Sequence, residues 1–308
     1  MDSNESLHLP MISIIIASLN SESQSYLRRC LESIRNQDYT GEIELIIADG
    51  GSTDQSISLS LSFGAKVISN PQVTELGFEG GKNLGIKHST GEFILLIDAD
   101  NILIEKNYIQ KMLEPFLADS SVSMTIPIPY VPRKKEAPSL VRFFAAMELT
   151  LWREKSKNGI AKKSWLNFSA KSIIVPNGAL MRRMFLEKAG GWDYDTEVGR
   201  RLIDNGFSNF ALVNVHRYHI EMRSYLEVYK KFKRRMINQI KEKNNKPTVQ
   251  GEMINTIHHP AYYLRNRIYL PLLLLLKEHD LLYLQTFPVS FIEFLLILKY
   301  YRPLTSYS

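Results

Sequence analysis

The sequence contains only one cysteine, Cys30, among 308 residues. A single thiol cannot form an intrachain disulfide or a cysteine-based zinc cluster, so both are excluded. The first ten residues, MDSNESLHLP, lack the basic start and the apolar centre of a secretory signal. We therefore expect a flexible N-terminus (1–10) on a protein of the reducing cytoplasm.

Long apolar runs are also lacking. The most apolar stretches, Ile268 to Leu276 and Phe287 to Leu298, fall short of the ~20 residues that span a bilayer, and each contains a proline. The basic run Tyr229 to Lys246 precedes them, with apolar residues at the spacing of an amphipathic helix. We predict a C-terminal helical region, 221–308, that binds a membrane surface or forms a dimer interface. Nucleic acid is not expected, because no recognised binding motif accompanies the charge.

The remaining composition is that of a folded protein, with 44% hydrophobic residues and a formal net charge of +6. Short β-branched stretches begin at residues 11, 43, 65 and 93, and stretches of helical periodicity cover 25–37 and about 81–89, the latter after a Gly-rich turn. This alternation predicts an α/β fold for residues 11–220, with a mainly parallel sheet covered by helices on both faces.

Polar and small residues follow the predicted strands, where ligands of such sheets bind. They are Ser18, Asn20, Asp49, Gly50, Gly51, Ser52, Asp54, Asp98 and Asp100. If the segment stays extended, Asp98 and Asp100 project to one side and Ala99 to the other. Such carboxylates are tolerated in solvent, at a helix cap or around a cation, and the spacing alone leaves these alternatives open. Neither GxGxxG nor GxxxxGK[ST] occurs, which argues against a standard dinucleotide fold or P-loop.

Four blocks occur in order: ISIIIASLN, IELIIADGGSTDQS, GGKNLGIKHSTGEFILLIDADN and VPNGALMRRMFLEKAGGWDYDTEVGRRLIDNGF. In this order they resemble the family 2 glycosyltransferases, whose catalytic domain has the GT-A fold, over roughly residues 11 to 220. The resemblance implies an inverting, metal-dependent transferase that moves one sugar from a nucleotide-diphosphate sugar to an acceptor.

The resemblance also implies roles for particular residues. Asp49 is expected to bind the base, Asp98 and Asp100 match the DxD motif that binds Mn²⁺ or Mg²⁺, and His216, ahead of His219, is expected to join the metal or the diphosphate. Lys82 stands where the family usually has arginine, so the charge is kept without the planar guanidinium. The expected nucleotide-sugar contacts are Ala17, Ser18, Asn20, Asp49, Gly50, Lys82, Asp98, Ala99, Asp100, Asn177 and Gly178, although Gly178 suits a buried turn equally well.

The expected catalytic base lies in DYDTEVGRRL. By resemblance Asp195 aligns with the usual base, Tyr194 replaces the glutamate that normally precedes it, and Glu197 is the alternative. An inverting transfer needs such a carboxylate to remove the proton of the acceptor hydroxyl. Taken alone, these acidic residues would equally suit the N-terminus of a helix.

Three functions remain as hypotheses. The first is transfer to a polyprenyl-linked or cell-surface glycan precursor by a protein peripheral on the inner face of the plasma membrane. The second is a soluble transferase acting on a free glycan or small molecule, with the C-terminal helices forming a homodimer. The third is a non-catalytic nucleotide-binding scaffold, suggested by the altered GKN and YD blocks. A processive synthase is not expected, because a QxxRW motif is absent.

Overall fold

A computed structural model describes residues 9–23, 25–70, 73–155, 164–169, 173–193, 195–220, 223–233, 237, 271–272, 275–276 and 281–301. The chain divides into two compact units. The first, here called the sheet unit, comprises Met1–Tyr130 and Leu149–Ile220; the second, the C-terminal unit, comprises Val131–Glu148 and Glu221–Ser308. Residues 131–148 group with the C-terminal residues, although they lie within the range 11–220 that we predict for the α/β fold.

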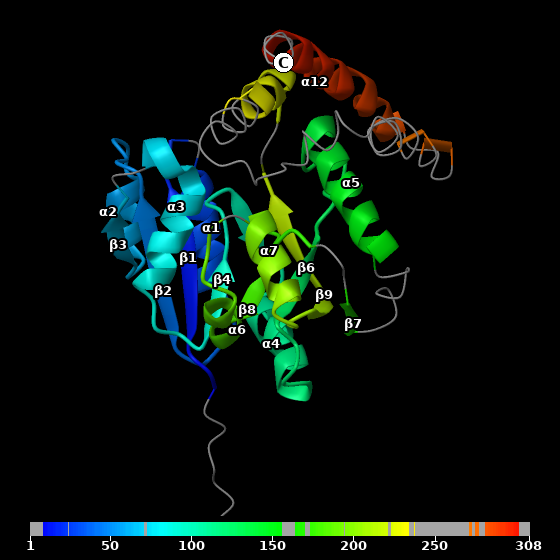
Figure 1. Ribbon diagram of the computed structural model, residues 1–308. Helices are drawn as coiled ribbons and strands as arrows, with labels where there is room; N and C mark the ends of the chain where they lie inside the picture. The colour runs from blue at the N-terminus through cyan, green and yellow to red at the C-terminus, as the bar shows by residue number, and fades with distance from the viewer. Residues whose placement is uncertain are drawn as a thin grey trace, which may run out of the picture. The chain divides into compact units, whose positions relative to one another are not determined.

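The sheet unit is built around a nine-stranded sheet (Figure 1). The strand order is β3-β2-β1-β4-β8-β6-β9-β5, with β7 paired to β9. The first four strands of this order pair in parallel, as do β6 and β9, and the remaining pairs are antiparallel. The expected α/β fold with helices around a mainly parallel sheet is confirmed. The strands are β1 (Ile12–Ser18), β2 (Ile43–Asp49), β3 (Lys66–Ser69), β4 (Phe93–Leu96), β5 (Asn101–Leu103), β6 (Met124–Pro129), β7 (Trp165–Ser169), β8 (Leu180–Arg182) and β9 (Asn209–His219).

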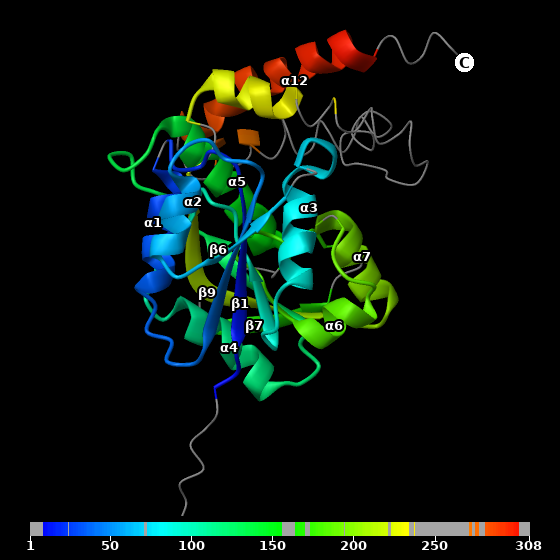
Figure 2. The ribbon, with the colours of Figure 1, turned by 90° about the vertical axis from the view of Figure 1, so that its left-hand side faces the viewer.

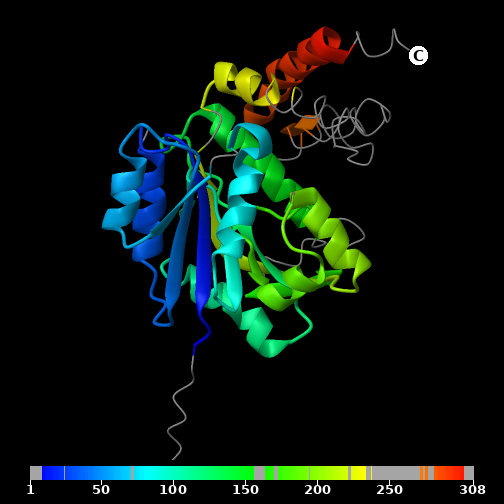
Figure 3. The same ribbon diagram turned by 60° about the vertical axis from the view of Figure 1, so that its left-hand side comes forward.

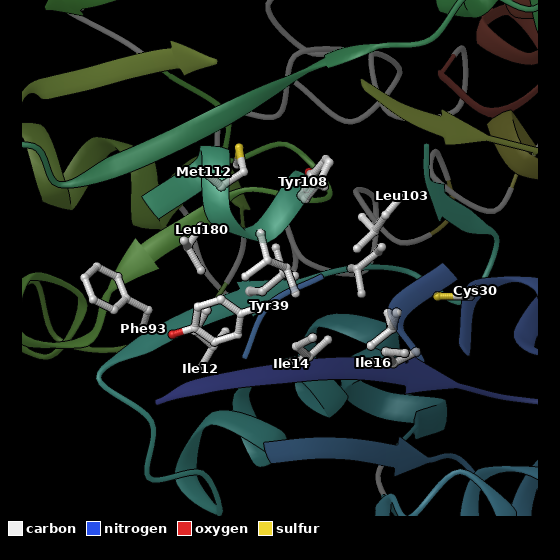
Figure 4. Packing of buried hydrophobic residues seen from close by; sticks show 14 of the residues in the cluster. Ile12, Ile14, Ile16, Cys30, Tyr39, Phe93, Leu103, Tyr108, Met112 and Leu180 are labelled. Atoms are coloured by element: carbon white, nitrogen blue, oxygen red, sulfur yellow. The ribbon is translucent and has the colours of Figure 1, made fainter. Parts of the chain in front are cut away.

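Helices cover both faces of this sheet, so β1 is buried along its whole length (Figures 2 and 3). Ile12, Ile14 and Ile16 pack against α1 (Tyr26–Arg35), α2 (Ser56–Ser62) and α4 (Tyr108–Ala118), in the cluster shown in Figure 4. Ile15 points to the opposite face, toward α3 (Val73–Lys87), α6 (Arg183–Lys188) and α7 (Asp195–Asp204). The alternation follows from the two-residue period of a strand.

Helix α3 begins earlier than predicted. We expected a Gly-rich turn before a helix at about 81–89, but the helix starts at Val73 and includes those glycines. A glycine inside a helix costs about 1 kcal/mol relative to alanine. Close packing offsets that cost: a Cβ at Gly81 would lie 3.0 Å from the Ala17 Cβ, and one at Gly85 would overlap the Ile15 Cγ2. The glycines therefore let α3 lie directly on β1.

The C-terminal unit is helical. It contains the first part of α5 (Ser139–Lys155), a helix over 225–233, the short 3-10 helix η3 (Leu281–Gln285) and α12 (Thr286–Tyr301). Of the predicted basic helix 229–246, residues up to 233 are helical, whereas 234–236 and 238–246 lie outside the described residues, as does most of 268–276. None of the helices in the described ranges combines the length and apolarity needed to cross a membrane. The core of the unit comprises Leu140, Phe143, Ala146, Val228, Phe232, Leu282, Tyr283, Val289 and Leu296.

We predict that Gly85→Ala destabilises the protein although alanine is the better helix former. The added methyl group meets the buried, β-branched side chain of Ile15, and overpacking of this kind costs about 1–3 kcal/mol. Urea unfolding monitored by circular dichroism measures the change. Lys87→Ala, at an exposed position of the same helix, should stay within about 0.5 kcal/mol of the wild type. Equal stability of both variants would contradict the close packing of α3.

Candidate functional site

The loops that follow β1 and β2 are fastened to each other by Asn20. Its side-chain oxygen accepts hydrogen bonds from the backbone nitrogens of Thr53 and Asp54, at 2.8 and 3.3 Å. Its own backbone nitrogen donates to the Ser52 Oγ at 2.9 Å. Asn20 adopts a positive φ of 50°, a conformation that asparagine tolerates better than most residues. One predicted nucleotide contact thus also fixes the shape of both loops.

The ends of β1 and β2 bring four more of the predicted residues to one edge of the sheet. Ser18 and Asp49 are partners in the parallel register, and the Gly50 nitrogen donates to the Ser18 carbonyl at 2.8 Å. The Asp49 carboxylate accepts hydrogen bonds from the backbone nitrogens of the two residues after Gly50, at 2.9 and 2.8 Å. Ala17 is buried immediately before Ser18. Asp49 is therefore held by its own loop.

The ammonium group of Lys82 lies between two carboxylates. Lys82 is only 6% exposed, and its Nζ lies 3.2 Å from Asp98 Oδ1 and 2.9 Å from Glu79 Oε1. Burial lowers the pKa of Lys82, but the two carboxylates outweigh burial and raise this pKa above its ordinary value. Burial likewise raises the pKa of Asp98, but the charges of Lys82 and His219 outweigh it and hold this pKa below its ordinary value. Both Lys82 and Asp98 are therefore charged at neutral pH.

The DxD segment forms a turn instead of continuing β4. The Asn101 nitrogen donates to the Asp98 carbonyl at 3.0 Å, which closes the turn. The segment therefore does not stay extended, and the two carboxylates have different neighbours. Asp98 contacts the buried ammonium, whereas Asp100 Oδ2 lies 3.2 Å from His219 Nε2. Ala99 is buried between them.

The two histidines of β9 have different acidic partners. His216 Nδ1 lies 2.6 Å from Glu105 Oε1, and its backbone nitrogen donates to Glu105 Oε2 at 2.8 Å. The structure thus places His219, rather than the predicted metal ligand His216, beside Asp100. Register explains the difference: β9 runs antiparallel to β5, so His219 pairs with Asn101, the residue next to Asp100.

Asn177 and Gly178 reach the same region from the segment before β8. The Asn177 side chain hydrogen bonds to the Asp98 carboxylate and helps to lower its pKa. Gly178 has a φ of 80° and accepts a hydrogen bond from the Tyr108 hydroxyl at 2.7 Å. A Cβ at Gly178 would lie 2.6 Å from that hydroxyl, so no larger residue fits. Gly178 is thus a buried turn glycine, one of the two alternatives that the sequence left open.

The two candidate bases lie in the first turn of α7, where negative charge suits a helix N-terminus. The Arg200 Nε donates to Glu197 Oε2 at 3.2 Å, and this interaction is the main cause of a lowered Glu197 pKa. Asp195 instead lies close enough to Lys82 for its charge to raise the pKa of that ammonium. Tyr194 lies outside the described residues. Asp195 is therefore the candidate on the side of the DxD segment.

Among the described residues, a divalent cation in this region would need further ligands from the substrate or from water. Across the described ranges, no three His, Cys, Asp or Glu side chains lie close enough together to hold a metal ion. Asp100 and His219 nevertheless form a pair of oxygen and nitrogen donors. Mg²⁺ and Mn²⁺ at nucleotide sites are commonly held by one or two side chains, with phosphate oxygens and water completing the shell. The pair fits that kind of site.

Sequence reasoning missed Glu79 and Trp192. Glu79 accepts from Lys82 through one oxygen and from the Trp192 Nε1 through the other, at 3.0 Å. Trp192 is 3% exposed, and the Lys82 Nζ lies 5.9 Å from the centre of its ring. The three-residue spacing of Glu79 and Lys82 places both on one side of a helix, but the region had been assigned to a turn. Glu79 thus links α3 to the segment that leads into α7.

We predict that Glu79→Gln lowers the free energy of unfolding by about 1–3 kcal/mol, because a buried ammonium loses one of its two charged partners. Burial raises the pKa of Glu79, so the wild type loses stability as the pH rises from the ordinary glutamate pKa through this raised value, and the difference from Glu79→Gln should narrow over that window. Glu187→Gln removes the exposed partner of Arg183, 3.8 Å away, and should change the free energy of unfolding by less than about 0.5 kcal/mol. Denaturant unfolding at neutral pH measures both. Losses of similar size would show that Lys82 does not depend on Glu79.

Comparison with known proteins places this chain in a family. The description Glycosyl transferase family 2 matches residues 13–190. The chain is 37% identical over 110 residues to the putative glycosyltransferase EpsH of Bacillus subtilis, a match that covers 35% of this chain and 30% of that protein. It is 35% identical over 107 residues to a PGL/p-HBAD biosynthesis glycosyltransferase of Mycobacterium bovis, covering 33% and 40%. The matches thus span less than half the length of either relative.

A solved structure agrees in fold. The mannosyltransferase PcManGT from Pyrobaculum calidifontis, determined with GDP-Man and Mn²⁺, superposes with a TM-score of 0.50 at 18% identity, covering 75% of this chain and 62% of that one. Because the family description matches residues 13–190 and the predicted residues lie at the strand ends, this chain belongs to glycosyl transferase family 2 and has the GT-A fold.

Proposed function

We propose that this protein transfers a single sugar from a nucleotide-diphosphate sugar to an acceptor hydroxyl, with inversion at the anomeric carbon and with a divalent metal ion. One observation carries the proposal. Beyond β4, Asp98 contacts both Lys82 and Asn177, and Asp195 and Asp100 lie nearby. This edge therefore offers a fixed positive charge, a metal-ligand pair and a carboxylate base to one substrate.

The nucleotide would occupy the edge formed by β1 and β2. The loops that Asn20 joins by hydrogen bonds present backbone nitrogens and the small residue Gly50, which permits close approach of the nucleotide. Asp49 is already held in place by its loop. A nucleotide base that donates hydrogen bonds to its remaining acceptor sites would therefore bind with little loss of side-chain freedom. The diphosphate, which carries negative charge, would lie toward Lys82.

Mn²⁺ or Mg²⁺ would be held by Asp100 and His219 and, when bound, would neutralise the negative charge of the diphosphate. Asp98 serves a different purpose in this proposal. Its pairing with Lys82 fixes the ammonium in a buried position, so the positive charge is in place before the substrate arrives.

Asp195 would act as the base. The acceptor oxygen bonds to the anomeric carbon while the bond from that carbon to the diphosphate breaks, the acceptor proton moves to Asp195, and the electron pair leaves with the diphosphate. Glu197 is the weaker candidate because its pairing with Arg200 lowers its pKa and occupies its oxygens. Asp195, in contrast, lies close enough to Lys82 for its charge to help raise the pKa of that ammonium.

The acceptor proposed is a polyprenyl-linked or cell-surface glycan precursor, met at the inner face of the plasma membrane. The basic and apolar composition of the C-terminal unit supports this over a free glycan. A soluble acceptor with a homodimer, and a nucleotide-binding scaffold without turnover, are the alternatives that the experiments below distinguish.

We expect Asp100→Asn to lower the rate of sugar transfer by about 100-fold or more, because a ligand of the cation loses its charge. Release of nucleoside diphosphate from a panel of nucleotide sugars, with Mn²⁺, with Mg²⁺ and with a chelator, measures the rate. Asp119→Asn, at a turn after α4, is the matched control and should retain the wild-type rate. Binding of a nucleotide sugar by the wild type without any turnover would instead support the scaffold.

We expect Asp195→Asn to lower the turnover number by about 10²–10⁴-fold, the usual contribution of a general base. Glu197→Gln, two residues further along the same helix, should lower the turnover number by less than about tenfold. The affinity for the nucleotide sugar, measured by calorimetry, should change little in either variant. A larger loss in Glu197→Gln than in Asp195→Asn would reverse the assignment.

A further inference from the structure

The outward side of α12 is apolar. Phe287, Phe291, Phe294 and Leu295 are 49%, 61%, 50% and 47% exposed, and their spacing of four, three and one residues places them on one side of the helix. These four residues are here called the phenylalanine face. Exposed leucines of η3 extend it, with Leu281 at 72% and Leu284 at 41%.

The opposite side of α12 is also apolar, because Val289 and Leu296 pack into the core of the C-terminal unit. Between Thr286 and Leu296 the one charged residue is Glu293, and it is 3% exposed. A helix at a water-exposed surface normally turns its charged residues outward. This helix does the reverse, so its outward side is suited to an apolar environment rather than to water.

A lysine-bearing helix borders the phenylalanine face. The helix over 225–233 shares a core cluster with α12 through Val228 and Phe232, and the two lie side by side in Figures 2 and 3. The Tyr225 hydroxyl donates to the side chain of Gln285, which ends η3. Leu226, 60% exposed, and the exposed Lys230 follow on this helix. Apolar and positively charged groups therefore lie next to each other on one unit.

The two units differ strongly in charge. The C-terminal unit carries 18 Lys and Arg against 9 Asp and Glu, a formal net charge of +9. The sheet unit carries 20 against 23, a net charge of −3. The positive charge of the chain is thus concentrated in the unit that bears the phenylalanine face.

We propose that the phenylalanine face inserts shallowly into an anionic phospholipid surface, with the basic residues of the C-terminal unit binding the headgroups. The inference deepens the proposed function, since it names the surface that would hold the enzyme at a membrane-borne acceptor. Charge selects this occupant over a second copy of the chain. A symmetric dimer through this face would bring two units of +9 together, whereas anionic lipid attracts such a unit.

Vesicle flotation of the full chain tests the proposal. We expect the wild type to float with vesicles of phosphatidylcholine and phosphatidylglycerol, and not with phosphatidylcholine alone, and to be released in part by high salt. The double variant Phe291→Ser, Phe294→Ser should lose about tenfold or more in partitioning, because two exposed phenylalanines no longer leave water. Leu117→Ser, at a 71% exposed leucine of α4 in the sheet unit, is the control and should float like the wild type.

Three results would overturn the inference. They are absence of flotation with anionic vesicles, equal flotation of the double variant, and a dimer in sedimentation that the double variant loses while vesicles bind neither protein. Unchanged circular dichroism and nucleotide binding show that the double variant is folded. Flotation can be measured without any sugar transfer. Flotation without sugar transfer would support the lipid-binding surface and contradict the proposed transferase activity. Sugar transfer to a soluble acceptor without flotation would support the transferase activity and contradict the lipid-binding surface.

Discussion

The buried ammonium of Lys82 is the interaction on which the rest of the site depends. A lysine at 6% exposure is tolerated only with charged partners, and Asp98 and Glu79 provide them from a turn and a helix. The ammonium can reach this position because glycines at 81 and 85 let α3 lie directly on β1. The two glycines lower the helix propensity of α3, but they allow the close packing that places a fixed positive charge at the edge of the sheet.

The pairing of Lys82 also divides the work of the two DxD carboxylates. Asp98 is engaged with the ammonium and with Asn177, while Asp100 lies beside His219. Had both carboxylates projected from one extended strand, they would repel each other and compete for the same cation. The turn that separates them places Asp98 at the ammonium of Lys82 and Asp100 beside His219, where the proposed metal ion would bind.

The sequence predicted those features that depend on local pattern. The continuous β-branched run of β1 predicts a buried strand, the position of the polar residues after β1, β2 and β4 predicts a binding edge, and the order of the blocks indicates the family. Features that depend on the register between strands could not be predicted from the sequence. Whether His216 or His219 lies beside Asp100 is decided by the antiparallel pairing of β9 with β5. Glu79 lies in a part of α3 that the glycine content predicts to be a turn, so its pairing with Lys82 does not follow from the sequence. Contacts between distant segments need the fold itself.

The charge difference between the units bears on how an anionic donor is bound. A sheet unit of net charge −3 offers no long-range attraction to a nucleotide diphosphate, and exposed charges are screened within about 10 Å at ordinary ionic strength. In the function proposed above, the donor would therefore be held by local charge, from the buried Lys82 and from a divalent cation. The +9 of the C-terminal unit follows a different logic, since charge spread over many exposed residues attracts an extended anionic surface better than a single small anion. In the two proposals, the sheet unit would thus bind a small anion and the C-terminal unit an extended anionic surface.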